Sequence, residues 1–180
     1  MLSEIREIFE GLEKKHQDLL QQLDSMPADT VCFKAGPDKW SILEAVEHLV
    51  LAEEDMLRQL TEADSATRLD PQDRSAENFQ VVIKVMERDI PVDVPDESME
   101  PHGEFSLEEL LDRWLDVRRK TRAHVESFAS EDAARLVYRH PFAGPLNLAE
   151  TLRFVDVHFD NHVRHLETIK ARARISSSSS

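Results

Sequence analysis

The stretch Trp40-Ser41-Ile42-Leu43-Glu44-Ala45-Val46-Glu47-His48-Leu49 decides how this chain folds. Ser41, followed three residues later by Glu44, forms a capping box, in which each side chain satisfies a free backbone N–H at the start of a helix. Apolar residues then recur every three or four positions, the spacing that gives a helix one buried face: Ile42, Ala45, Val46, Leu49, Met56 and Leu60. The sequence therefore predicts a long amphipathic helix that begins at Ser41.

Three further segments have the same helical periodicity. One covers residues 3–25, a second opens with the capping box of Ser106 and Glu109, and the last opens at Asn147, with Glu150 three residues on. Only four glycines occur, and no strand-like alternation persists. Four amphipathic helices of about 20 residues bury their apolar faces best against one another. We therefore predict an all-α fold, a four-helix bundle.

Residues 64–104 differ from the helical segments. They are acidic, contain four of the eight prolines, and hold one apolar patch at residues 79–86, for which we predict a short helix. Such a segment predicts a long crossover between the second and third helices of the bundle. We expect residues 1–173 to form a single domain. Residues 174–180 end in five serines and are expected to be a disordered tail.

Composition narrows the classes of function. The 22 Lys and Arg residues stand against 36 Asp and Glu residues, a formal charge of −14, so binding to nucleic acid is not expected. No apolar run of about 18 residues exists, and no membrane association is expected. The single cysteine, Cys32, excludes an internal disulfide, and the polar N-terminus lacks the features of a signal peptide. We expect a cytoplasmic protein.

Two histidines, His158 and His162, are four residues apart in the last predicted helix. Residues so spaced lie on the same helical face, one turn apart, and paired helical imidazoles can bind one metal ion. His48, on the Ser41 helix, would complete a three-histidine site with open coordination positions. The structural alternative is that each imidazole is a buried core residue that bonds a neighbouring carboxylate or carbonyl.

The remaining histidines receive lesser roles. His165 continues the face of His158 and His162 and is expected behind the metal ligands, whereas His124 is a candidate fourth ligand. Glu44 is one turn before His48 and could orient its second ring nitrogen, although the capping box alone accounts for it. The others are predicted to be surface or loop residues: His16, His102 and His140.

Three segments, in order, resemble motifs of the DinB-like family. Residues 40–49 resemble W-S-x-x-E-x-x-x-H-L, and residues 140–146 resemble H-P-x-x-G-x-L. His158, His162 and His165-Leu166 resemble H-x-x-x-H-x-x-Q-I/L, with His165 where glutamine is common. The resemblance covers residues 2–171.

This resemblance implies a bundle that holds a divalent metal, Zn, Ni, Fe or Mn, through His48, His158 and His162. It also implies homodimers and, in characterised relatives, transfer of a low-molecular-weight thiol to a small-molecule substrate.

We therefore expect a metal-dependent thiol S-transferase. The alternatives are a metal-dependent hydrolase, in which the metal activates water, and a non-catalytic metal-binding or stress protein. Whether the chain is an enzyme at all stays open at this stage. A thiol cofactor with an acidic portion would need a cationic group near the metal, and five arginines are candidates: Arg118, Arg119, Arg122, Arg153 and Arg164.

Overall fold

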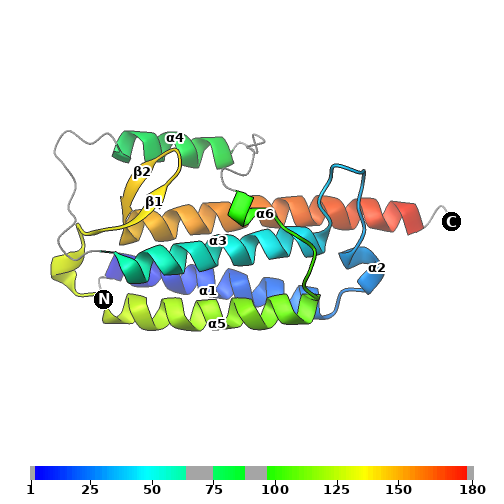
Figure 1. Cartoon of the computed structure of the whole chain (residues 1–180), viewed down its shortest axis with the longest axis horizontal. Coiled ribbons are helices and arrows are strands. Elements are labelled where there is room, and N and C mark those ends of the chain that lie inside the picture. Colours follow the sequence, from blue (N-terminus) through cyan, green and yellow to red (C-terminus); the bar gives the residue numbers. More distant parts are fainter. Residues whose placement is uncertain (1–2, 64–74, 88–96, 178–180) are drawn as a thin grey trace.

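The structure is a computed structural model that describes residues 3–63, 75–87 and 97–177. These residues are mostly helical (Figure 1). Four long helices lie side by side: α1 (Ser3–Asp24), α3 (Ile42–Glu62), α5 (Leu107–Ser127) and α6 (Leu148–Ser177). The α3 helix packs against α5 and α6, and α1 packs against α6. No helix in the described part of the chain is long and apolar enough to cross a membrane.

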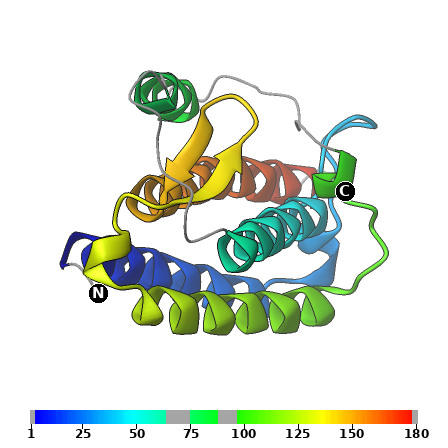
Figure 2. The same ribbon diagram turned by 60° about the vertical axis from the view of Figure 1, so that its left-hand side comes forward.

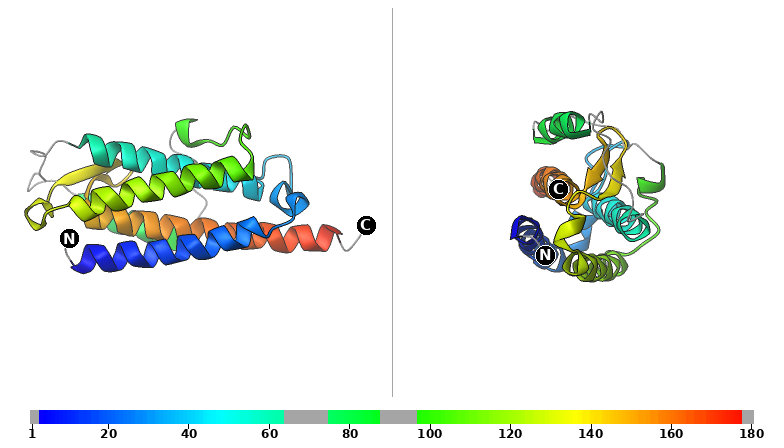
Figure 3. Two further views of the ribbon diagram at one scale, coloured as in Figure 1. Left: turned by 90° about the horizontal axis from the view of Figure 1, so that it is seen from below. Right: turned by 90° about the vertical axis from the view of Figure 1, so that its left-hand side faces the viewer.

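The direction of the four helices explains the long crossover. Helices α1 and α6 run one way, and α3 and α5 run the opposite way (Figure 1). Because α3 and α5 are parallel neighbours, the chain between them must return along their whole length. The predicted helix in this crossover is confirmed as α4 (Ser75–Glu87), which packs outside α6, and the 3-10 helix η1 (Glu97–Met99) contacts α3 (Figure 3). Other parts of the crossover, residues 64–74 and 88–96, lie outside the described residues.

The predicted capping boxes at Ser41 and Ser106 are both present. The Ser41 hydroxyl accepts the backbone N–H of Glu44, and Glu44 accepts the backbone N–H of Ser41 at 2.8 Å. Ser106 and Glu109 repeat this arrangement at the start of α5. These local bonds satisfy free N–H groups and set where the two helices begin. Short helices fill two connections: α2 (Ala28–Val31) and η2 (Ser130–Asp132).

The all-α prediction is wrong at one place, just before α6. Strands β1 (Leu136–His140) and β2 (Gly144–Asn147) pair antiparallel and rest between α3, α4 and α6 (Figure 2). Gly144 turns the chain with a φ of +81°, a conformation that glycine adopts without strain. The hairpin leads directly into α6, where Asn147 and Glu150 bond each other's backbone N–H groups at 3.0 Å, as their spacing predicted. At its other end α6 continues past residue 173 to Ser177.

A cluster of charged side chains is buried among α1, α3 and α5. The Arg118 guanidinium bonds Glu53 at 3.0 Å through Nη1 and Glu13 at 2.7 Å through Nε, and Arg122 also pairs with Glu13. Burial alone would raise the pKa of Glu13, but the charges and hydrogen bonds of Arg118 and Arg122 together outweigh it and lower that pKa. Burial likewise opposes the charged form of Arg118, yet Glu53 and Glu13 raise its pKa. The cluster therefore holds its charges inside the fold by mutual pairing.

The prediction that His16 is a surface residue is wrong. It is 3% exposed and lies edge-on to Trp114, with ring centroids 4.4 Å apart. Its position follows the spacing of the buried residues of α1: Phe9, Leu12, Leu19 and Leu23. Burial, helped by the positive charge of Arg118, lowers the pKa of His16 from 6.5 to about 4.

We expect His16 to make the fold sensitive to mild acid. Between pH 6.5 and about 4 the unfolded chain binds a proton at His16 that the folded chain does not, so stability falls as the pH falls. The pKa difference corresponds to about 3 kcal/mol. The free energy of unfolding of His16→Phe, measured by urea denaturation, should therefore rise relative to wild type by about that amount between pH 7 and pH 4. Parallel pH profiles for the two proteins would contradict this expectation.

Candidate metal centre

The three histidines singled out by the sequence meet in the structure. His48 comes from α3, and His158 and His162 come from successive turns of α6. Nε2 of His158 lies 3.4 Å from Nε2 of His48 and 3.1 Å from Nε2 of His162. All three ligand atoms lie within 4.8 Å of one another. In the described part of the chain they form the one such group of three or more potential metal ligands.

The spacing of the nitrogens fits a single metal ion. Imidazole nitrogens bind zinc at about 2.0–2.1 Å, so two of them on one ion, at tetrahedral or octahedral angles, are about 2.9–3.4 Å apart. The two Nε2 distances at His158 fall in that range. Three protein ligands also leave coordination positions for an exogenous molecule.

The hydrogen bonding of His48 sets its tautomer. Its Nδ1 lies 2.8 Å from the backbone oxygen of Met99, which can only accept, so Nδ1 carries the hydrogen and Nε2 presents a lone pair. The predicted partner, Glu44, instead bonds Ser41 and pairs with Lys34 at 2.6 Å, as the capping-box alternative required. The contact to Met99 joins residues 51 positions apart, which no local motif encodes.

Burial keeps the three imidazoles neutral. It lowers the pKa of His158 to about 3, with a smaller contribution from His48. Burial, followed by the neighbouring His158, lowers the pKa of His162 well below its usual value. Burial also lowers the pKa of His48, although the bond to Met99 opposes the shift. Neutral imidazole is the form that coordinates a metal.

Neutral imidazoles do not satisfy one another in this arrangement. Nε2 of His48 presents a lone pair, and Nε2 of His158 contacts Nε2 of both His48 and His162. A hydrogen on Nε2 of His162 bridges its contact with His158 but leaves the lone pairs of His158 and His48 facing each other, whereas a hydrogen on Nε2 of His158 can point to only one of its two neighbours. A cation at their centre would satisfy all three nitrogens at once, so the donor set fits a divalent metal.

Two aromatic side chains border the three histidines. The Trp40 ring lies 5.1 Å from His48 and stacks on His162 at 6.4 Å. Phe154 stacks on His158 at 5.5 Å and also meets the edge of His140. These rings limit the rotation of the imidazoles and keep water from part of their surface, which helps to hold them neutral.

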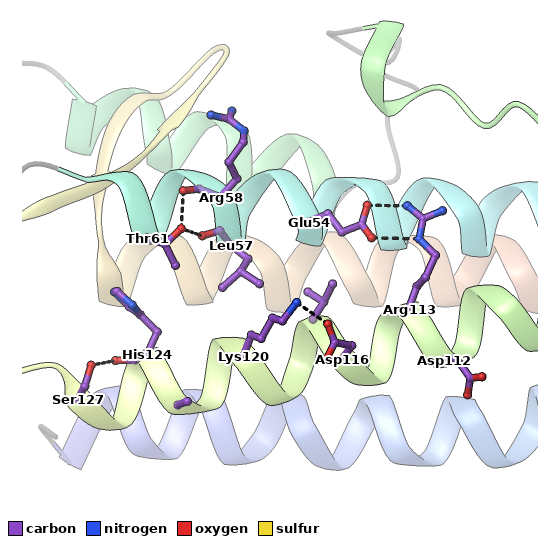
Figure 4. A pocket seen from close by; sticks show the side chains of 12 residues that line it. Glu54, Leu57, Arg58, Thr61, Asp112, Arg113, Asp116, Lys120, His124 and Ser127 are labelled. Carbon is purple, nitrogen blue, oxygen red and sulfur yellow. Dashed lines mark hydrogen bonds and ion pairs between the residues drawn. The ribbon is translucent and has the colours of Figure 1, made fainter.

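The other histidines lie elsewhere. His165 is exposed, with its ring edge-on to His162 at 5.8 Å. The fourth-ligand prediction for His124 is not supported, because His124 lines a groove between α3 and α5 with Leu57, Asp116 and Lys120 (Figure 4). His102 is exposed, as predicted.

His140, predicted to be a surface or loop residue, is 4% exposed at the end of β1. Its Nδ1 accepts the backbone N–H groups of Phe142 and Ala143 at 3.1 and 3.0 Å. The imidazole thus closes the hairpin turn, and this gives the H-P-x-x-G-x-L segment a structural role in placing the start of α6.

The five candidate arginines each have partners outside the three histidines. Arg118 and Arg122 belong to the buried charge cluster, and Arg119 pairs with Asp116 on the same helix. Arg153 pairs with Glu4, and Arg164 donates to the backbone oxygen of Met86.

A family model for the DinB superfamily matches residues 12–166. This chain therefore belongs to the DinB superfamily, and the resemblance read from its three motifs is confirmed. No curated protein and no solved structure matches the chain significantly.

Proposed function

We propose that this chain is a four-helix-bundle metalloprotein in which His48, His158 and His162 bind one divalent ion, and that it acts as a metal-dependent thiol S-transferase. The observation that supports metal binding best is the convergence of three neutral imidazole nitrogens at distances suited to a single ion. Membership of the DinB superfamily agrees with this reading.

The neutral ligand set favours an anionic partner. Three imidazoles carry no charge, so a bound divalent ion would keep its full positive charge and lower the pKa of a thiol or water at an open position. The chain's own residues would hold the imidazoles in place, through Met99 on His48 and through Trp40 and Phe154 on the ring faces. In the proposed transfer, the thiolate sulfur forms a bond to an electrophilic carbon as the leaving group departs with its electron pair.

The second candidate function is hydrolysis. Three-histidine zinc sites can activate water, and the same neutral ligand set favours bound hydroxide as much as thiolate. The two functions differ in one requirement, because hydrolysis proceeds without an added thiol.

The test begins with elemental analysis of the purified protein, followed by reconstitution of the metal-free protein with Zn²⁺, Ni²⁺, Fe²⁺ or Mn²⁺. Each form is incubated with an electrophile panel, with and without low-molecular-weight thiols, and the products are identified by mass spectrometry. We expect thioether products that require both metal and thiol and disappear in His158→Ala but not in the control His124→Ala. Product formation without thiol would favour the hydrolase. Tight metal binding without turnover would contradict the transferase, and absence of metal binding would overturn the whole proposal.

A further inference from the structure

Glu47 is a fully buried carboxylate next to a proposed metal ligand. Its side chain is 0% exposed, and its two oxygens accept the backbone N–H groups of His102 and Gly103 at 3.0 and 2.9 Å. A buried carboxylate without partners is very costly, and charge-assisted bonds from consecutive backbone N–H groups offset that cost. Glu47 therefore ties the last part of the crossover to α3, across 55 and 56 positions of sequence.

The segment that Glu47 holds is the one that orients His48. Met99 lies three residues before His102, and its backbone oxygen accepts the Nδ1–H of His48 at 2.8 Å. Two adjacent residues of α3 thus bind residues 99–103 at two points. Because the two bonds of Glu47 limit how far this segment can move, they also limit where the Met99 oxygen can lie. In a histidine that binds a metal through one ring nitrogen, the other ring nitrogen commonly donates to such a partner, which sets the tautomer and the ring orientation.

We propose that Glu47 is a positioning residue for the metal centre. It holds residues 99–103 against α3, so that Met99 keeps the hydrogen of His48 on Nδ1 and the lone pair on Nε2. Its effect on metal affinity rests on the proposed metal binding, whereas its effect on the His48 tautomer is a property of the metal-free protein. The two effects can therefore be tested separately.

The variant Glu47→Gln tests this proposal. Glutamine has nearly the same shape, but its amide oxygen accepts one N–H while its NH₂ group meets the other donor. In metal-free protein, ¹⁵N NMR of the imidazole nitrogens should show His48 changing from the Nδ1–H form to a mixture of tautomers. Zn²⁺ affinity, measured by competition with a chromophoric chelator, should weaken by about 10-fold to 100-fold, the usual cost of losing such a partner.

Glu53→Gln is the matched control. Glu53 is on the same helix and is 3% exposed, but its partner is Arg118 and not the crossover. This variant should lose stability while the His48 tautomer stays unchanged and the Zn²⁺ affinity stays close to that of wild type. The proposal is overturned if Glu47→Gln keeps the Nδ1–H form of His48, or if Glu53→Gln weakens Zn²⁺ binding as much as Glu47→Gln does.

A second variant covers the case in which Glu47→Gln does not fold. Gly103→Pro removes the N–H that donates to Glu47 and cannot adopt the φ of +70° found at this position, while α3 keeps its carboxylate. It should also change His48 from the Nδ1–H form to a mixture of tautomers. If His48 keeps the Nδ1–H form, the proposal is overturned. If wild-type protein binds no Zn²⁺, the proposed function fails, but the tautomer comparison still decides the role of Glu47.

Discussion

His158→Ala should abolish metal binding, lowering the affinity for Zn²⁺ by more than about 100-fold, since loss of even an outer partner of a ligand costs 10-fold to 100-fold. Nε2 of His158 is the central nitrogen of the three, within 3.4 Å of His48 and 3.1 Å of His162. Its removal leaves only two of the three nitrogens, one on α3 and one on α6. Competition with a chromophoric chelator measures the affinity, and elemental analysis reports the metal that the protein retains.

The histidine variant His124→Ala is the control for this experiment, because His124 lines the groove between α3 and α5 (Figure 4). It should bind metal as wild type does. Circular dichroism of both variants establishes that each is folded before affinities are compared. Equal metal content in wild type and His158→Ala would show that the metal binds elsewhere.

Arg118→Ala should lower the free energy of unfolding by about 3–5 kcal/mol, the usual cost of removing one partner from a buried ion pair. The Arg118 side chain is 4% exposed and neutralises Glu53, which is equally buried, together with Glu13. Its loss leaves Glu53 in the protein interior without its cation. Urea denaturation at pH 7 measures the change.

Arg119→Ala is the matched control, since Arg119 is the next residue on α5 but pairs with Asp116 at the surface. Exposed pairs of this kind contribute at most about 1 kcal/mol. Adding Glu53→Gln to Arg118→Ala should recover part of the lost stability, because the uncompensated charge is removed. A cost for Arg118→Ala no larger than that for Arg119→Ala would show that the cluster is not held by charge pairing.

The features predicted correctly from sequence are those encoded locally. The capping boxes of Ser41 and Ser106 lie within four residues, so they mark helix starts without knowledge of the rest of the chain. The pairing of His158 with His162 likewise follows from one helical turn. That His48 meets them was inferred from its place on a second amphipathic helix, together with the motif resemblance.

For one of the wrong predictions, the sequence contained a pattern that indicates the correct position. His16 was assigned to the surface, yet it keeps the spacing of the α1 core positions Leu12 and Leu19. The β1 strand is only five residues long, too short for its alternation to stand out, and its burial depends on the helices around it.

Other contacts could not have been read from the sequence. The bonds from Met99 to His48 and from Glu47 to His102 and Gly103 join residues more than 50 positions apart. They depend on the path of the crossover, which no local pattern in residues 64–104 defines. From the sequence, the partner of His48 is therefore predicted on the same helix, at Glu44, whose carboxylate is already bonded in the capping box.

Because 110 positions of sequence separate His48 from His158, metal binding at the proposed centre should report on the folding of the chain. A chain whose helices have formed but not docked contains only the His158 and His162 pair, since the third nitrogen arrives with α3. Contacts between residues so distant in sequence are the slow ones to form. In a stopped-flow refolding experiment with Co²⁺, the visible absorption of the coordinated ion would therefore time the docking of α3 on α6, separately from the far-ultraviolet signal of helix formation.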